Sequence, residues 1–290
     1  FASPSNNKYN SDNIQQALQN QMSSSISYSK TWTGMSMSVN ASHSQNSRDS
    51  SYAITFPNIT FTVNRFFPFK RKNGVGSEKF YEKISLSYNS SMQNKINFKV
   101  KELKDMNIMD RLQNGMTHNF AIGLPSFTIL NYIQAAPSIS YGMNWYFREQ
   151  TKRYDPETDQ VITEMTPQFS RFGISQTYSA GISFSTRIYG LFNFGKDKKV
   201  QAIRHMISPQ LGINLKPELG TAMNGYRTYT YIDKNGKEKS VEYNKYAGNL
   251  TSPPGRGRNA GLTFSVGNNI EAKISNPKDS TGKGFNKIKA

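Results

Sequence analysis

The chain has 290 residues, no cysteine and a formal net charge of +17 at pH 7, from 36 Lys and Arg against 19 Asp and Glu. The lack of cysteine excludes disulfides, Cys-based metal sites and Cys nucleophiles. Aromatic residues make up 12% of the chain, which excludes a disordered polar chain. The charge favours an anionic partner such as nucleic acid, anionic lipid or an acidic glycan, and the alternative is a solvated basic surface.

The remaining polar residues are mainly Ser, Thr, Asn and Gly, a composition typical of a water-filled barrel lumen and of secreted β-sandwiches. No apolar run approaches the roughly 20 residues of a membrane helix, but a closed barrel also satisfies its backbone groups in lipid. The chain begins at Phe1 without a signal peptide, so we expect a processed chain or a piece of a longer one.

Residues 1–21 lack a strand pattern and predict a linker or loop. From residue 22 onward, apolar and polar residues alternate with period 2, as in strands with two different faces. Residues 25–29 and 35–42 predict a hairpin, and the phase slip at Pro57 predicts a β-bulge between residues 52–56 and 59–63. Residues 84–89 and 96–100 predict two strands joined by a turn at 92–94.

Further strands are predicted at 118–124, 139–147 and 203–215, and one unusually long strand at 172–194. Residues 226–232 and 241–243 predict a small hairpin, because Asn235-Gly236 suits a type I′ turn. The last two strands are expected to flank a turn at 267–269.

Long and short connections alternate along this series of about eleven strands. The long ones lie near residues 65–78, 101–115, 150–170 and 217–257, and the short ones at 44–49, 92–94, 195–199 and 267–269. Outer-membrane barrels have long extracellular loops and short periplasmic turns. The sequence therefore predicts an all-β fold, a transmembrane antiparallel β-barrel, with residues 22–290 forming a segment of a large outer-membrane barrel whose four long loops are extracellular.

Two groups of cations are candidate contacts for an anionic passenger. Lys70, Arg71 and Lys72 lie in a predicted extracellular loop, where they either contact lipopolysaccharide phosphates or form a solvated basic loop. A second group falls on the polar phase or at the end of its strands, and either lines a cationic lumen or pairs with acids such as Glu82. This group is Arg148, Arg187, Arg204 and Lys216.

No catalytic, cofactor or metal site is predicted, and the chain is not expected to be an enzyme. His43, His118 and His205 lie on separate strands and on the apolar phase, which favours packing over a three-His metal site. The short Arg256-Gly257-Arg258 run is too weak a signal for RNA, so no nucleic-acid partner is expected.

Three stretches resemble the LptD family of lipopolysaccharide-assembly outer-membrane proteins in its divergent Bacteroidota-type form. They are FPNITFTVNRFFPFKRKNGVGSEKFYEKISLSYNSS (56–91), PSISYGMNWYF (137–147) and STRIYGLF with QAIRHMISPQLGINLKPEL (185–219). The resemblance implies a very large barrel with a lateral gate, an LptE-like plug lipoprotein, a periplasmic jelly-roll domain and periplasmic Lpt bridge components. No jelly-roll segment precedes Ser23 and further strands would be expected after Ala290, so only the barrel portion is expected here and gate residues are not transferred.

These observations lead to an expected role in moving lipopolysaccharide into the outer leaflet without covalent chemistry, in an outer-membrane location and in contact with outer-membrane lipids. Two alternatives stay open. One is a general outer-membrane channel or transporter barrel, and the other is a secreted β-sandwich that binds acidic glycan.

Overall fold

The computed structural model describes residues 21–73, 75–102, 104, 107, 111–195, 198–275 and 285–289, the last stretch by its backbone alone. The linker expected at 1–21 lies outside these residues, except that Gln21 begins the first strand. Among the described helices, none is long and apolar enough to cross a membrane.

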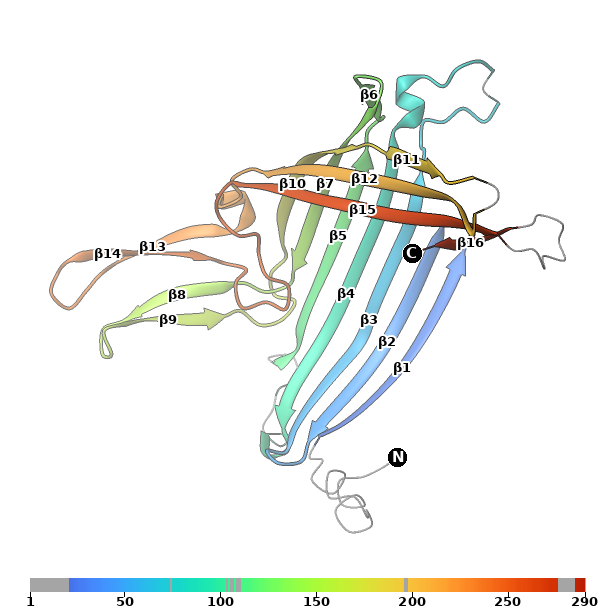
Figure 1. Cartoon of the computed structure of the whole chain (residues 1–290). Coiled ribbons are helices and arrows are strands. Elements are labelled where there is room, and N and C mark those ends of the chain that lie inside the picture. The colour runs from blue at the N-terminus through green and yellow to red at the C-terminus, as the bar shows by residue number, and fades with distance from the viewer. Residues whose placement is uncertain are drawn as a thin grey trace, which may run out of the picture.

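One antiparallel sheet of 12 strands dominates the structure (Figure 1). Its main path runs β1-β2-β3-β4-β5-β7-β10-β12-β15-β16, with β6 on β7 and β11 on β12. The strands are β1 Gln21–Trp32, β2 Met35–Asn46, β3 Ser51–Phe66, β4 Ser85–Lys99, β5 Gln113–Gly123, β6 Phe127–Ile129, β7 Ile133–Tyr146, β10 Gly173–Ser185, β11 Ile188–Asn193, β12 Val200–Lys216, β15 Asn259–Ser275 and β16 Phe285–Lys289.

Two short hairpins extend beyond this sheet: β8 (Gln150–Asp155) with β9 (Gln160–Met165), and β13 (Tyr226–Ile232) with β14 (Glu238–Asn244). They lie side by side (Figure 1). The Tyr154 ring of the first hairpin stacks on the Tyr231 ring of the second, with centroids 4.8 Å apart. Three 3-10 helices complete the described elements: η1 (Phe80–Lys83), η2 (Val100–Glu102) and η3 (Ala222–Asn224).

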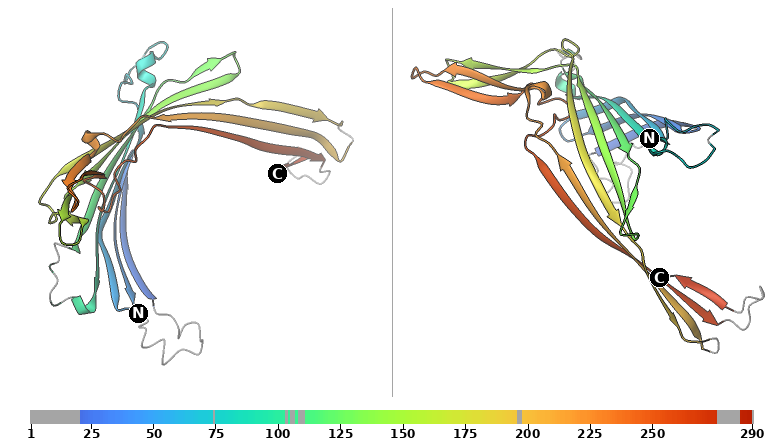
Figure 2. Two further views of the ribbon diagram at one scale, coloured as in Figure 1. Left: turned by 90° about the vertical axis from the view of Figure 1, so that its left-hand side faces the viewer. Right: turned by 90° about the horizontal axis from the view of Figure 1, so that it is seen from above.

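The sheet is open and strongly bent, with β1 at one end of its strand order and β16 at the other (Figure 2). The predicted all-β antiparallel architecture is therefore confirmed, whereas closure into a barrel stays a prediction. The sandwich alternative requires a second sheet on the apolar face, and none is present among the described residues.

Several local predictions are confirmed. The β1–β2 and β13–β14 hairpins form. Gly236 has a φ of 72°, in the left-handed region, but Asn235 does not, so the turn is not the expected type I′. The register between β2 and β3 shifts between Asn40 and Ser42, so that two residues, Phe56 and Pro57, lie opposite one. This is the predicted bulge.

The turns predicted at 92–94 and 267–269 are wrong, because β4 and β15 each run straight through them. In both strands a polar residue occupies the apolar phase and was mistaken for a turn signal. Asn94 is buried and donates from Nδ2 to the Pro57 carbonyl at 3.4 Å, and Asn268 Oδ1 lies 3.2 Å from His205 Nε2. Partners across the sheet therefore satisfy both amides without ending the strand.

The long strand predicted at 172–194 is divided into β10 and β11 at Thr186 and Arg187. Both parts pair with β12 in one unbroken register, from Ala180↔Leu215 to Asn193↔Ala202. The interruption lies opposite Pro209, which has no N–H to donate to a ladder.

These corrections change the placement of the loops. With β4 and β15 continuous, strand order puts the connections 100–112, 147–172 and 217–258 at one end of the sheet and 67–84 at the other. Figure 1 shows the 67–84 connection beside β6, far from the β8–β9 and β13–β14 hairpins. The prediction that the loops near 65–78, 101–115, 150–170 and 217–257 share one side is therefore wrong for 65–78.

Candidate functional site

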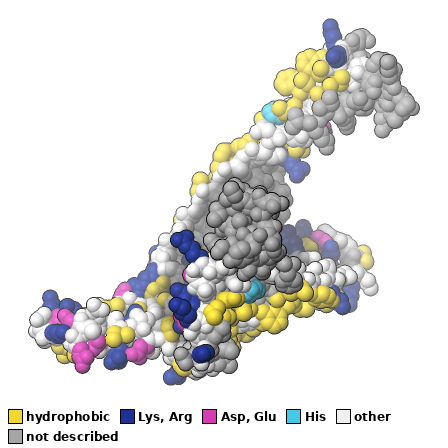
Figure 3. Space-filling model, turned by 90° about the horizontal axis from the view of Figure 1, so that it is seen from below, with side chains coloured by type: hydrophobic (Ala, Val, Ile, Leu, Met, Phe, Trp, Pro, Cys, Tyr) yellow, Lys and Arg dark blue, Asp and Glu magenta, His cyan; other side chains and the backbone are white. Residues whose placement is uncertain are grey.

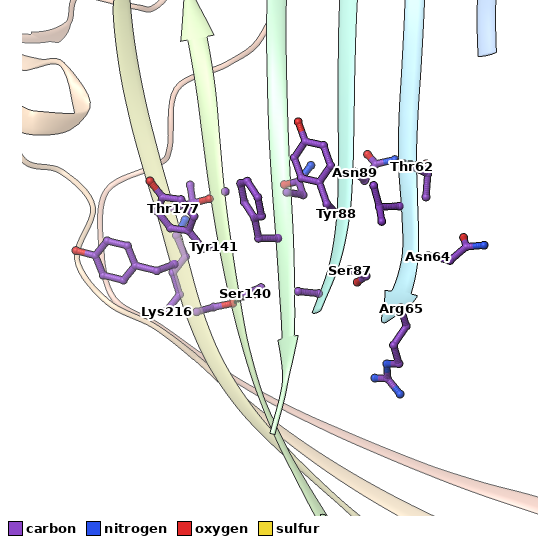
Figure 4. A pocket seen from close by; sticks show the side chains of 17 residues that line it. Thr62, Asn64, Arg65, Ser87, Tyr88, Asn89, Ser140, Tyr141, Thr177 and Lys216 are labelled. Carbon is purple, nitrogen blue, oxygen red and sulfur yellow. Dashed lines mark hydrogen bonds between the residues drawn. The ribbon is translucent and has the colours of Figure 1, made fainter. Parts of the chain in front are cut away.

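A polar trough of about 600 Å³ crosses the middle of one face of the sheet. Strand pairing aligns small polar side chains from neighbouring strands there, since residues that pair directly share a face. One row consists of Thr62, Asn89, Asn119, Gly142 and Thr177, and the next contains Ser87, Ala121, Ser140 and Ser179. Figure 4 shows Thr62, Asn89, Ser140 and Thr177 on these strands.

Side chains that line the trough bond to one another along the sheet. Asn89 Nδ2 donates to Thr62 Oγ1 at 2.9 Å, and the Ser140 and Ser179 hydroxyls lie 2.6 Å apart. At Gly142 a Cβ would lie 2.5 Å from Thr177 Oγ1, so a larger residue would displace this row. The result is a hydrated surface that presents hydroxyl and amide groups to a polar ligand.

Two cations stand at the same end of this trough and on opposite sides of it, Arg65 at the end of β3 and Lys216 at the end of β12 (Figure 4). Neither forms a salt bridge among the described residues. Cations without an acidic partner that lie beside hydroxyl groups can bind phosphate or carboxylate groups.

The connection between β12 and β15, residues 217–258, folds over one end of the same face. Tyr146 of β7 and Tyr246 of this connection are buried and stack with centroids 4.3 Å apart. Tyr146 Oη also lies 3.0 Å from Ser175 Oγ of β10. A Cβ at Gly173 would lie 2.3 Å from Tyr246 Oη and 2.4 Å from a carbon of its ring, so glycine is required at that position. We call residues 219–254 of this connection, which include the β13–β14 hairpin, the cap.

Arg148 lies beneath the cap. Its Nη2 donates to the Gly248 carbonyl at 3.2 Å, and burial lowers the pKa of its guanidinium. The Asn249 side chain in turn donates to the Arg148 carbonyl at 3.2 Å. Arg148 therefore holds the cap to the end of β7 and is only 7% exposed, which places it away from a passenger in the trough.

The opposite face of the sheet is apolar and largely uncovered. Leu262 and Phe264 of β15 are 70% and 67% exposed, and Ile26 of β1 is 73% exposed. Hydrophobic side chains form bands along the margins of the bent sheet in Figure 3. Exposed apolar surface of this extent is typical of contact with a membrane or another protein.

Aromatic residues pack along this apolar face. His118 lies between Tyr88, whose hydroxyl is 2.7 Å from His118 Nδ1, and Trp145, whose ring centroid is 4.4 Å away. This is the packing role predicted for that histidine. Within the described residues no group of three His, Asp or Glu side chains could hold a metal ion.

Two of the three cations predicted in the basic loop, Lys70 and Arg71, form ion pairs with acids of the same loop. Arg71 and Glu82 form a two-bond ion pair, with Nε to Oε1 at 2.5 Å and Nη2 to Oε2 at 2.9 Å, and Lys70 pairs with Glu78 at 2.9 Å. These bonds, with the Lys79 N–H, lower the pKa of Glu82 to about 2. Of the three predicted cations, only Lys72 forms no salt bridge among the described residues.

The other predicted cations do not gather at one place. Arg204 on β12 pairs across the sheet with Glu271 on β15 at 3.5 Å, as the ion-pair interpretation expected. Arg187 lies in the interruption between β10 and β11 and is exposed. Of the seven candidates, only Lys216 lies in the trough.

Arg65 and Arg258 were missed by the sequence analysis. Arg65 precedes the Lys70–Lys72 run, and Arg258 belonged to the discounted Arg-Gly-Arg run. A usable signal was their position: each lies at a strand boundary, where a long side chain can reach the polar face.

A family model described as "LptD protein" matches residues 1–290. No curated protein matches the chain. The family match spans the whole sequence and agrees with the long two-faced antiparallel strands. The chain therefore belongs to the LptD protein family.

Proposed function

We propose that the chain forms part of an outer-membrane β-barrel that transports and assembles lipopolysaccharide without covalent chemistry. The observation that supports this most strongly is the two-faced sheet, with a hydroxyl-rich, cation-flanked trough on one face and exposed apolar side chains on the other. Its strands of up to 17 residues exceed the 9–11 needed to span a bilayer. Family membership supports lipopolysaccharide as the passenger.

In this proposal the apolar face contacts lipid and the polar face lines the lumen. The sugars and phosphates of the passenger pass along the trough, where hydroxyl and amide groups replace water, and Arg65 and Lys216 attract the phosphates. An LptE-like plug lipoprotein and the periplasmic Lpt bridge are the expected partners.

Depletion of the protein in cells tests the function directly. Surface lipopolysaccharide, measured by labelling intact cells, is expected to fall while total lipopolysaccharide persists. A general transporter barrel would leave surface lipopolysaccharide unchanged, and that result would contradict the proposal. Recovery in the outer-membrane fraction and heat-dependent migration in SDS test the location and the barrel separately.

A further inference from the structure

A second cavity, of about 870 Å³, opens where β10 and β12 separate. The two strands pair only from Ala180↔Leu215 to Ser185↔Gln210, whereas β10 continues along β7 back to Gly173. The ladder ends because Pro217, the next residue after β12, has no N–H to donate. We call this opening, with its lining residues, the fork.

The cap covers the free edge of β10 beyond the fork. Asn224 of η3 accepts a hydrogen bond from the Gln176 N–H at 2.7 Å, in the place where a neighbouring strand would supply a carbonyl. Asn224 Nδ2 also donates to the Leu219 carbonyl at 2.9 Å, and both residues are buried. The cap therefore supplies a hydrogen-bond partner to the unpaired edge of β10 and holds the fork open.

The fork joins the two faces of the sheet. Its apolar lining includes Tyr178, Ala180 and Leu215, which belong to the apolar face, together with Ile139 and Ala260. Tyr178, Ser179 and Lys216 also line the polar trough. A molecule in the fork can thus keep a polar group at the trough while an alkyl chain lies against the apolar face.

The polar rim of the fork is cationic. Lys216 and Arg258 both line the cavity, and neither forms a salt bridge among the described residues. The one acid in the lining, Glu218, accepts from the backbone N–H groups of Gly220 at 2.6 Å and Gly257 at 2.8 Å. The Glu218 carboxylate is therefore bonded to backbone N–H groups, and Lys216 and Arg258 are available to bind an anion.

We propose that the fork holds one phosphorylated lipid, with its phosphate on Lys216 and Arg258 and an alkyl chain on Tyr178, Ala180 and Leu215. Charge complementarity selects the phosphate, and the apolar lining selects a lipid over free phosphate. The proposal rests on the proposed function for the supply of such a lipid. The proposal adds a lipid-binding subsite within the sheet, between β10 and β12, which pair with each other only along part of their length.

Photocrosslinking to the purified full-length protein in neutral detergent tests this subsite. The probe is dodecyl phosphate with a diazirine in its chain, and labelled peptides are located by mass spectrometry. We expect labelling to concentrate on the peptides that carry Tyr178 to Ala180 and Leu215, and to be displaced by unlabelled dodecyl phosphate but not by inorganic phosphate.

The double variant Lys216→Gln/Arg258→Gln is expected to reduce labelling at the fork at least about tenfold, since it removes two charge-assisted contacts. The matched variant Lys70→Gln/Lys72→Gln, which removes two cations of the β3–β4 loop that do not line the fork, should change it less than about twofold. Lys216→Arg/Arg258→Lys, which keeps both charges, should retain labelling. If the first variant does not fold, the single variants Lys216→Gln and Arg258→Gln should each reduce labelling about threefold.

Three results would overturn the proposal: uniform labelling of the apolar face, unchanged labelling in the Lys216→Gln/Arg258→Gln variant, or displacement by inorganic phosphate. Because the assay uses purified protein, it is independent of surface lipopolysaccharide in cells. Fork labelling with unchanged surface lipopolysaccharide would leave the lipid subsite in place and refute the function, and the reverse pattern would refute the subsite alone.

Discussion

The loop between β3 and β4 and the fork between β10 and β12 both carry clustered cations, but their charges are neutralised differently. In the loop, Arg71 and Lys70 are bonded to Glu82 and Glu78 of the same loop. In the fork, the nearby acid Glu218 is bonded to backbone N–H groups, and Lys216 and Arg258 have no acidic partner among the described residues. The consecutive basic residues Lys70 and Arg71 are therefore paired within their own loop. Lys216 and Arg258, which are far apart in the sequence, form the better candidate anion site.

The two regions also differ in what holds them. The loop is closed by its own ion pairs within about a dozen residues. The fork depends on the cap, which belongs to the connection between β12 and β15. Aromatic stacking anchors the cap on β7, and an amide hydrogen bond anchors it on β10. Substitutions in the cap should therefore affect the fork, and substitutions in the loop should not.

The largest effect is expected from Tyr246→Ala. It removes a buried ring that stacks on Tyr146, and truncation of a buried aromatic residue costs about 3–5 kcal/mol. Hydrogen exchange should show loss of protection in residues 219–254 while the β3–β4 loop is unchanged. Tyr246→Phe retains the stacked ring and serves as the control; an equal loss in that variant would contradict the packing explanation.

If the apolar face contacts lipid as proposed, Ile182→Arg on β10 is expected to destabilise the protein by about 2–4 kcal/mol, because it places a cation on that face near the membrane midplane. Reversible unfolding from lipid vesicles measures this cost. Ser183→Arg, one residue along and on the polar face, should cost much less. Equal costs would show that the apolar face is not in lipid.

Asn224→Ala should cost about 1–3 kcal/mol, because it leaves the Gln176 N–H and the Leu219 carbonyl without their partner. Faster exchange of the Gln176 amide is the specific readout. Asn224→Asp keeps an oxygen acceptor for that amide and should protect it. Exchange as fast as in the alanine variant would mean that the cap does not hold the edge of β10.

The smallest effect concerns the pH response of the loop. The pKa of Glu82 is lowered from 4.5 to about 2 by Arg71 and the Lys79 N–H, so its stabilisation is complete above about pH 4.5 and is lost as pH falls through about 2. Pepsin cleavage at Phe67–Phe80 should therefore rise only as pH approaches 2. Glu82→Gln should be cleaved more readily throughout that range, and identical pH curves for the two proteins would refute the role of this ion pair.

Much of the sheet could be predicted from the sequence, because period-2 alternation directly reports two different faces. The Pro57 bulge and the Asn235-Gly236 hairpin follow from local backbone chemistry and were also predictable. The turns at 92–94 and 267–269 were not, because the partners that satisfy Asn94 and Asn268 come from β3 and β12. The false turn at 92–94 reversed the order of loop ends and misplaced the 65–78 loop relative to the other three, whereas the one at 267–269 follows all four loops and did not affect them.

The candidate site was less predictable than the fold. Lys216 could be predicted because the alternation of apolar and polar residues along β12 places it on the polar face. Arg258 lines the fork because Lys216 pairs with Asn259, so that the chain passes the end of β12 again 42 residues later. The burial of Arg148 under the cap and the capture of Arg71 by Glu82 likewise depend on tertiary contacts that no sequence spacing encodes.

The central claim is that neighbouring residues of one strand face lipid and water in turn. The chain has no cysteine, so single cysteines can be placed along β10 without background. In lipid vesicles, Ser179→Cys and Ser183→Cys should react rapidly with a membrane-impermeant maleimide, whereas Ile182→Cys and Phe184→Cys should react slowly. A fluorescent label attached at Ile182→Cys or Phe184→Cys should be quenched by brominated lipid. Equal reaction rates at Ile182 and Ser183 would contradict the assignment of the apolar face to the membrane.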